Sequence, residues 1–251
     1  MLSDLTDLEI LTGILTIIYI VFDFFVGFLC FSKIKTAESQ KILLFIMGIF
    51  VITLSSPWWP VAIQFLLYIS NDIIMDTISY LFLTYWLVPL GMIFWLWIVY
   101  KLAFYKNKKY IAFFIYSVVT CVGFYIFIMI SLFINTPLIG SKEGYLNITF
   151  NVIPNILSIY GLTINLISGG IFFYKSWKAA STSKEYTSIV KALFMFLGFG
   201  FFTFSAIFQT VPVIDIPLIA VILKITAILS ALCFYFVFFL PKILIKRLKI
   251  K

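Results

Sequence analysis

The chain has 251 residues, of which 63% are hydrophobic and 11% are charged, and its mean hydropathy is +1.15. Soluble domains carry about 45–50% apolar and about 25% charged residues. The composition therefore excludes a protein that only water surrounds, and it indicates that lipid is the solvent for much of the chain.

Apolar runs long enough to cross about 30 Å of hydrocarbon recur along the whole chain. They exceed the length of barrel strands and lack their alternating polar positions, which leaves helices as the only spanning structure. We predict an all-α membrane protein, a single domain of seven helices, at residues 10–31, 42–69, 77–104, 110–134, 150–174, 192–211 and 216–240.

Two segments outside these runs have a distinct composition. The link at 135–149 contains Pro137, Gly140 and Gly144, which predicts non-helical structure. Residues 241–251 form a basic tail in which apolar and basic residues alternate at roughly helical spacing. The tail is either a short helix on the membrane surface or ordinary topological charge.

The basic residues are distributed unevenly between alternate links. One side has Lys142 against seven acidic residues, and Asp23 and Lys224 lie within helices. The links after the first, third and fifth helices, with the tail, hold Lys33, Lys35, Lys41, Lys101, Lys106, Lys108, Lys109, Lys175, Lys178, Lys184, Lys191, Lys242, Lys246, Arg247, Lys249 and Lys251. By the positive-inside rule this pattern predicts a multi-pass protein of the cell membrane, with its amino terminus outside and its carboxyl terminus in the cytoplasm.

The net charge of +8 is explained by the same pattern. Basic loops and the tail would lie beside the inner leaflet, where anionic lipids attract each Lys or Arg by about 1 kcal/mol. The expected partners are therefore the bilayer and its anionic inner-leaflet lipids, and no nucleic acid is expected.

Two charged residues fall inside predicted helices, where a charge costs about 2.5–3.5 kcal/mol on insertion scales. Asp23 would lie about 20 Å and Lys224 about 12 Å from the outer side, at 1.5 Å per residue. One hypothesis is that both line a single interior polar site. The alternative is that Asp23 is hydrogen-bonded locally and that Lys224 extends toward the interface.

Pro57, Trp58, Trp59 and Pro60 stand in the middle of the second apolar run. Two prolines within four residues interrupt the hydrogen-bond ladder of a helix, which predicts a helix break in the outer half. The break would either open a ligand pocket, as in transporters, or be a kink with an aromatic belt.

Neutral polar residues could complete such a pocket. Gln64 and Gln209 are candidates, together with Asn155, Asn165, Tyr80, Tyr85, Trp86 and Tyr160. The alternative role of such residues is hydrogen bonding between helices, at about 0.6 kcal/mol each.

Signatures of enzymes and of cofactor sites are missing. The chain has no histidine, and its three cysteines, Cys30, Cys121 and Cys233, lie within apolar runs or at their ends. We find no GxSxG, paired intramembrane aspartates or metal-ligand constellation. No catalytic, cofactor-binding or metal-binding residue is therefore predicted, and no enzymatic activity is expected.

The predicted topology is similar to that of seven-helix receptors and sensor modules, which favours a receptor-like or sensory protein without its own output domain. A separate cytoplasmic signalling partner would then supply the output. One alternative is a small neutral-solute transporter or channel. Another is a retinal-binding protein with Lys224 as the Schiff base, but Lys224 lies nearer the outer side than this use requires.

Overall fold

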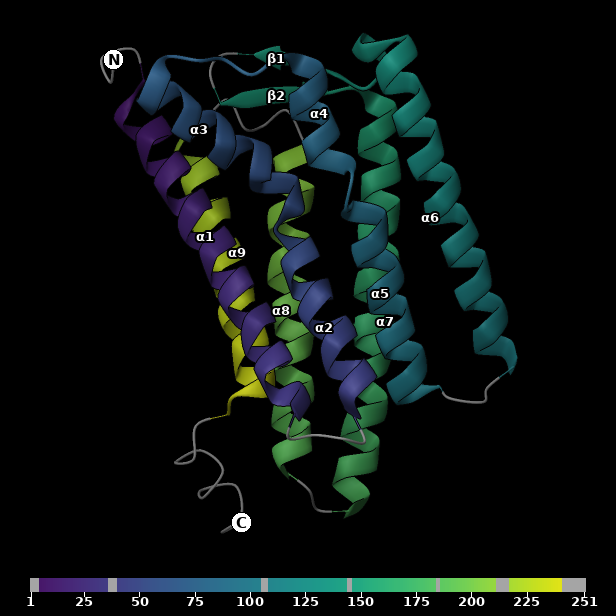
Figure 1. Cartoon of the computed structure of the whole chain (residues 1–251). Coiled ribbons are helices and arrows are strands. Elements are labelled where there is room, and N and C mark those ends of the chain that lie inside the picture. Colours follow the sequence, from purple (N-terminus) through teal and green to yellow (C-terminus); the bar gives the residue numbers. More distant parts are fainter. Residues whose placement is uncertain are drawn as a thin grey trace.

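Seven helices that are long and apolar enough to cross a membrane run side by side in the computed structural model (Figure 1), within the residues that the structure describes. Those residues are 5–35, 40–104, 108–143, 146–183, 186–210 and 217–240. The basic tail at 241–251 lies outside them. The prediction of a helical fold with seven potential spans is confirmed.

The last helical span packs against the first. α9 contacts both α1 and α8, and α2 packs between α1 and α5 (Figure 1). The helices are α1 (Asp7–Ser32), α2 (Lys41–Leu54), α3 (Trp59–Asn71), α4 (Thr77–Tyr85), α5 (Val88–Ala103), α6 (Lys108–Ile134), α7 (Val152–Ser183), α8 (Tyr186–Thr210) and α9 (Pro217–Phe238).

Local hydrogen bonds place some helix ends beyond the apolar runs. α1 begins at Asp7 because Thr6 and Glu9 form a capping box, in which the Thr6 hydroxyl accepts from the Glu9 amide at 3.3 Å. α7 extends nine residues past the predicted end at 174 and reaches Ser183. The helix continues past the apolar run because the Lys and Ala residues that follow it have high helix propensity.

The second span is two helices with a 3₁₀ turn, η4 (Ser56–Trp58), between them. Pro57 has no N–H, so the Thr53 carbonyl loses its helical partner. The Ser56 hydroxyl donates to this carbonyl instead, at 2.8 Å. The Ser55 hydroxyl likewise donates to the Ile52 carbonyl at 2.9 Å. The break at Pro57 is thus stabilised by hydroxyl groups from the same segment.

The third span is also interrupted, where one helix at 77–104 was predicted. α4 ends at Tyr85 and α5 begins at Val88, with Trp86 and Leu87 between them. The two breaks face each other, because the Trp59 and Trp86 rings lie 6.0 Å apart, edge to face.

The predicted non-helical link contains a 3₁₀ turn, η5 (Thr136–Leu138), and a β-hairpin. Strand β1 (Gly140–Glu143) pairs antiparallel with β2 (Asn147–Phe150), with Gly140 opposite Phe150. The Tyr80 hydroxyl of α4 donates to the Leu146 carbonyl at 2.9 Å and fixes the hairpin to the bundle.

The two ends of the bundle differ in charge. The end that carries the hairpin and the start of α1, here called the hairpin end, includes Asp7, Glu9, Asp72 and Asp76. The opposite end, here called the lysine end (lower in Figure 1), includes Lys33, Lys35, Lys41, Lys101, Lys108, Lys175, Lys178 and Lys191.

Close backbone approach joins α1 to α2. A Cβ atom on Gly27 would lie 2.9 Å from the Gly48 carbonyl oxygen, and one on Gly48 would lie 3.0 Å from the Gly27 carbonyl oxygen. Small residues at a helix crossing allow such contact in membranes, where dispersion forces replace the hydrophobic effect between helices.

Candidate functional site

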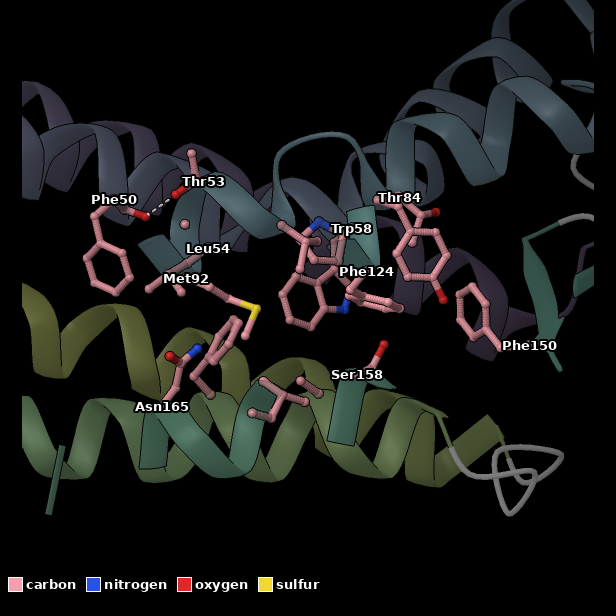
Figure 2. Close-up of a pocket in the computed structure, with 17 residues that line it drawn as sticks. Phe50, Thr53, Leu54, Trp58, Thr84, Met92, Phe124, Phe150, Ser158 and Asn165 are labelled. Atoms are coloured by element: carbon pink, nitrogen blue, oxygen red, sulfur yellow. Dashed lines mark hydrogen bonds between the residues drawn. The ribbon is translucent and has the colours of Figure 1, made fainter. Parts of the chain in front are cut away.

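A cavity of about 120 Å³ lies between the helices, next to both helix breaks. Its walls come from α2, η4, α4, α5, α6, β2, α7 and α8 (Figure 2). The lining residues are Phe50, Thr53, Leu54, Pro57, Trp58, Thr84, Tyr85, Val88, Gly91, Met92, Phe124, Phe150, Ser158, Leu162, Asn165, Phe202 and Ala206.

The helix breaks shape the wall of this cavity. The η4 turn contributes Pro57 and Trp58, and the end of α4 contributes Tyr85. The Trp58 ring packs edge to face on Phe202 at 5.7 Å, and the Tyr85 ring packs in the same manner on Phe150 at 5.7 Å. These two aromatic pairs hold the rings that border the cavity.

The hairpin closes one side of the cavity. Phe150 is the last residue of β2 and also a lining residue. The Asn155 amide donates to the Phe150 carbonyl at 3.2 Å, and the next backbone N–H, of Asn151, donates to the Ile139 carbonyl at 3.0 Å. The start of α7 thereby fixes the position of Phe150.

Every lining residue is uncharged, and a few are polar. The Thr53 hydroxyl donates to the Phe50 carbonyl at 2.7 Å, and the Thr84 hydroxyl donates to the Tyr80 carbonyl at 2.9 Å. These hydroxyls have therefore used their protons, and their oxygens can still accept.

Asn165 is the polar lining residue with an open hydrogen-bonding group. It is only 4% exposed, and its Oδ1 has no hydrogen-bond partner among the described residues. Figure 2 shows its amide pointing from α7 toward Met92, across the cavity from Thr53 and Phe50. A buried acceptor without a partner costs about 1–3 kcal/mol, so a ligand donor there would stabilise the protein.

An aromatic cluster borders the cavity on the side toward the lysine end. It consists of Phe50, Trp95, Phe199 and Phe234, all at most 2% exposed. The Trp95 and Phe199 ring centres are 3.8 Å apart, and Phe50 stacks on these two rings at 5.7 and 5.6 Å. The Trp95 indole N–H donates to the Ser168 hydroxyl at 2.7 Å. We call this set the aromatic floor.

No protein-family model matches the sequence, and comparison with curated proteins and with solved structures likewise finds no match.

The residues predicted to form the helix-break pocket separate into two groups. Pro57 and Trp58 line the cavity, as do Tyr85 and Asn165. Trp59 and Pro60 are not lining residues; the Trp59 indole donates to the Ser55 hydroxyl at 3.1 Å. The backbone of Gln209 belongs to α8, but its side chain lies outside the described part of the structure.

Gln64 has a different role from the one predicted. It is fully buried, yet it faces the link between α3 and α4 and does not line the cavity. Its side-chain amide donates to the Ile73 carbonyl at 3.1 Å, and its side-chain oxygen, Oε1, accepts from the Met75 backbone amide at 2.7 Å. These bonds satisfy backbone groups that the non-helical link leaves open.

Asp23 and Lys224 are both buried, with 1% and 4% exposure. Neither carboxylate oxygen of Asp23 makes a well-formed hydrogen bond with a described residue, so none joins Asp23 to Lys224, and the Tyr19 hydroxyl is the group that interacts with the Asp23 carboxyl. Tyr19, one helical turn before Asp23, is its polar neighbour.

Trp58 contacts both Tyr19, the neighbour of Asp23, and Lys224. The Tyr19 ring packs edge to face on Trp58 at 5.2 Å, and the Lys224 Nζ atom lies 5.3 Å from the Trp58 ring centre. Lys224 thus lies at the helix break, whereas Asp23 is related to Trp58 only through its neighbour Tyr19. Neither Asp23 nor Lys224 lines the cavity, so the cavity itself presents no lysine to a retinal aldehyde.

Most of the lining was not predicted from the sequence. Phe50, Phe124, Phe202 and Met92 stand in uniformly apolar runs, where the residue type is the same whether a side chain faces lipid or a cavity. Ser158 gave no signal either, because serine is common between membrane helices.

Proposed function

We propose that the chain is an integral protein of the cell membrane whose hairpin end faces outward and whose lysine end faces the cytoplasm. The separation of charge between the two ends supports this orientation. Lysines beside the inner leaflet would bind anionic lipids. The cavity would then lie in the half of the bundle nearer the outside.

In this membrane the protein would act as a receptor-like sensor of a small molecule that binds in the cavity. The observation that carries this proposal is the aromatic floor, because it separates the cavity from the lysine end with tightly packed rings. A site with a packed floor suits the detection of a ligand better than its passage.

The floor also supports a route for the signal. Phe50 lines the cavity and stacks on Trp95 and Phe199, so a ligand that displaces Phe50 must also disturb these rings. α5, α8 and α9 each contribute one ring and continue toward the lysine end. Packed cores switch between discrete arrangements more readily than they deform continuously. A separate cytoplasmic partner would read the change at that end.

A second candidate is a carrier of a small neutral solute, and the paired breaks in the second and third spans favour it. Broken helices mark substrate sites in many transporters, where unwound carbonyls coordinate ions. At the break in the second span, however, the Ser55 and Ser56 hydroxyls already occupy the Ile52 and Thr53 carbonyls. This arrangement supports a structural break more than an ion site.

Cysteine labelling distinguishes the two functions, since the native cysteines are buried. Ser181→Cys at the lysine end and Asn71→Cys at the hairpin end both lie at exposed positions. In sealed vesicles, an impermeant maleimide added from the extracellular side should label Asn71→Cys only.

In nanodiscs, toluene should change the labelling rate of Ser181→Cys if the protein is a sensor. Proteoliposomes should then take up toluene-sized neutral solutes no faster than empty liposomes. An unchanged rate together with protein-dependent uptake would favour the carrier.

A further inference from the structure

The chemistry of the cavity wall restricts the ligand, and this restriction rests on the proposed role of the cavity as the binding site. Six of the lining side chains are aromatic: Phe50, Trp58, Tyr85, Phe124, Phe150 and Phe202. Aromatic walls favour a flat aromatic guest through offset and edge-to-face contacts.

The size of the cavity limits that guest to one ring system. Its volume is about 120 Å³, close to the roughly 150 Å³ of an engineered apolar cavity that binds benzene. Ligand sites for larger molecules have about 300 Å³ or more.

The charge of the guest follows from what surrounds the wall. No lining residue is charged, and an unpaired ion would lose its hydration without compensation. A cation could in principle use the aromatic faces, but the wall has no carboxylate to compensate for its lost hydration. The guest is therefore neutral.

The polar groups of the wall determine where the guest is polar. Thr53 and Thr84 have given their protons to backbone carbonyls, and Asn165 Oδ1 has no partner. Asn165 Oδ1 is thus a wall acceptor without a partner among the described residues, and a ligand donor would satisfy it. We propose that the cavity binds a neutral, single-ring-sized aromatic molecule with one O–H or N–H group, which donates to Asn165.

The test compares two probes of nearly equal shape, 4-fluorophenol and 4-fluorotoluene, by fluorine NMR titration of the full chain in nanodiscs, with empty nanodiscs as the blank. Both probes should bind, and the phenol should bind about three- to tenfold more tightly, as expected for one hydrogen bond. Asn165→Leu, which keeps the branched shape of the side chain and removes the acceptor, should abolish this preference and retain 4-fluorotoluene binding. Retained 4-fluorotoluene binding also shows that the variant is folded.

Two further variants complete the design. Thr163→Ala changes an exposed residue of the same helix and should leave both affinities unchanged. Ala206→Phe places a ring inside the cavity and should block both probes.

The outcomes separate the ligand class from the site. Equal affinity for the two probes in the native chain, or a preference that survives in Asn165→Leu, would overturn the ligand class and leave the cavity as a binding site. Displacement of 4-fluorotoluene by tetramethylammonium would overturn the neutral class. Failure of both probes to bind above the blank, or binding that survives in Ala206→Phe, would overturn the cavity site itself.

Discussion

The Lys224 Nζ atom lies 5.3 Å from the centre of the Trp58 ring. This contact joins the last helical span to the break in the second span. Trp58 also contacts Tyr19 and Phe202, so it is shared between the polar interior around α1 and the wall of the cavity. This position makes Trp58 the residue through which the buried charge could influence the site.

A double-mutant cycle measures this contact. Trp58→Leu, Lys224→Met and the double variant should show a coupling of about 0.5–2 kcal/mol, the range of cation–π pairs with partial or complete desolvation. Thermal unfolding in one fixed detergent gives the stabilities. Strict additivity of the two substitutions would mean that the ring does not stabilise the ammonium.

Substitution of Asp23 should not destabilise the protein, although the residue is charged and buried. Its carboxyl group is buried and makes no well-formed hydrogen bond with a described residue, so its burial costs free energy that the burial of an apolar side chain does not. Asp23→Leu should therefore unfold at the same temperature as the native chain or at a higher one. A loss of stability above about 2 kcal/mol would show that Asp23 makes a stabilising interaction.

The break in the second span depends on the Ser56 hydroxyl. Ser56→Ala removes the hydroxyl that donates to the Thr53 carbonyl, which then keeps only a backbone N–H, and should reduce the free energy of unfolding by about 0.5–1.5 kcal/mol. Thr163→Ala is the matched control, because the Thr163 hydroxyl also donates within its helix, to Ile159 at 2.8 Å, in a segment without proline. Equal effects of the two changes would contradict this account of the break.

Two glycines with different surroundings test the packing of α1 on α2. Gly48→Ala would force its Cβ against the Phe31 ring and the Gly27 carbonyl, and should destabilise the protein. Gly200→Ala meets no atom within 4 Å and should stabilise α8 by up to about 1 kcal/mol through helix propensity. Chemical unfolding of both variants should give opposite signs, and a shared sign would refute the assigned contacts.

Stability should also fall at acidic pH because of Asp76, which caps α4 just before the apolar third span. Its carboxylate accepts from the Ser79 amide at 2.9 Å. Hydrogen bonds from Ser79 hold the pKa of Asp76 below its usual value. The stabilisation is therefore complete above the unfolded pKa of about 4 and is lost as the pH falls through the lower folded value.

The variant Asp76→Asn removes this charge and should flatten that part of the stability profile between neutral and acidic pH. The effect is small because Asp76 is almost fully exposed to solvent. A steep acid dependence that persists unchanged in Asp76→Asn would assign it to other carboxylates.

The spans could be predicted because each apolar run extends over a whole helix and the lysines mark the links between the runs. The break at Pro57 could be predicted because proline removes a backbone donor whatever the tertiary structure. The sequence did not reveal that Ser56 would supply the replacement, because this depends on the local geometry of the break. It also did not reveal that the third span would break at Trp86, whose ring packs on Trp59 of the second span.

The candidate site was only partly predictable for a related reason. Asn165 and Tyr85 stand out as polar groups in apolar runs, and both line the cavity. Gln64 stands out equally, yet it serves a link between helices. In a membrane helix the lipid-facing and interior sides are both apolar, so periodicity does not separate them, and only the packed structure assigns each polar group to a cavity, a link or a helix contact.

The most direct test of the account is to locate a bound probe in the structure. A crystal of the chain grown with 4-bromophenol should give an anomalous bromine peak inside the cavity between Trp58 and Met92, with the probe hydroxyl within hydrogen-bond distance of Asn165. A bromine peak only at the lipid-facing surface, with the cavity filled by rearranged side chains, would contradict the proposal that this interior space is the site at which the protein detects its ligand.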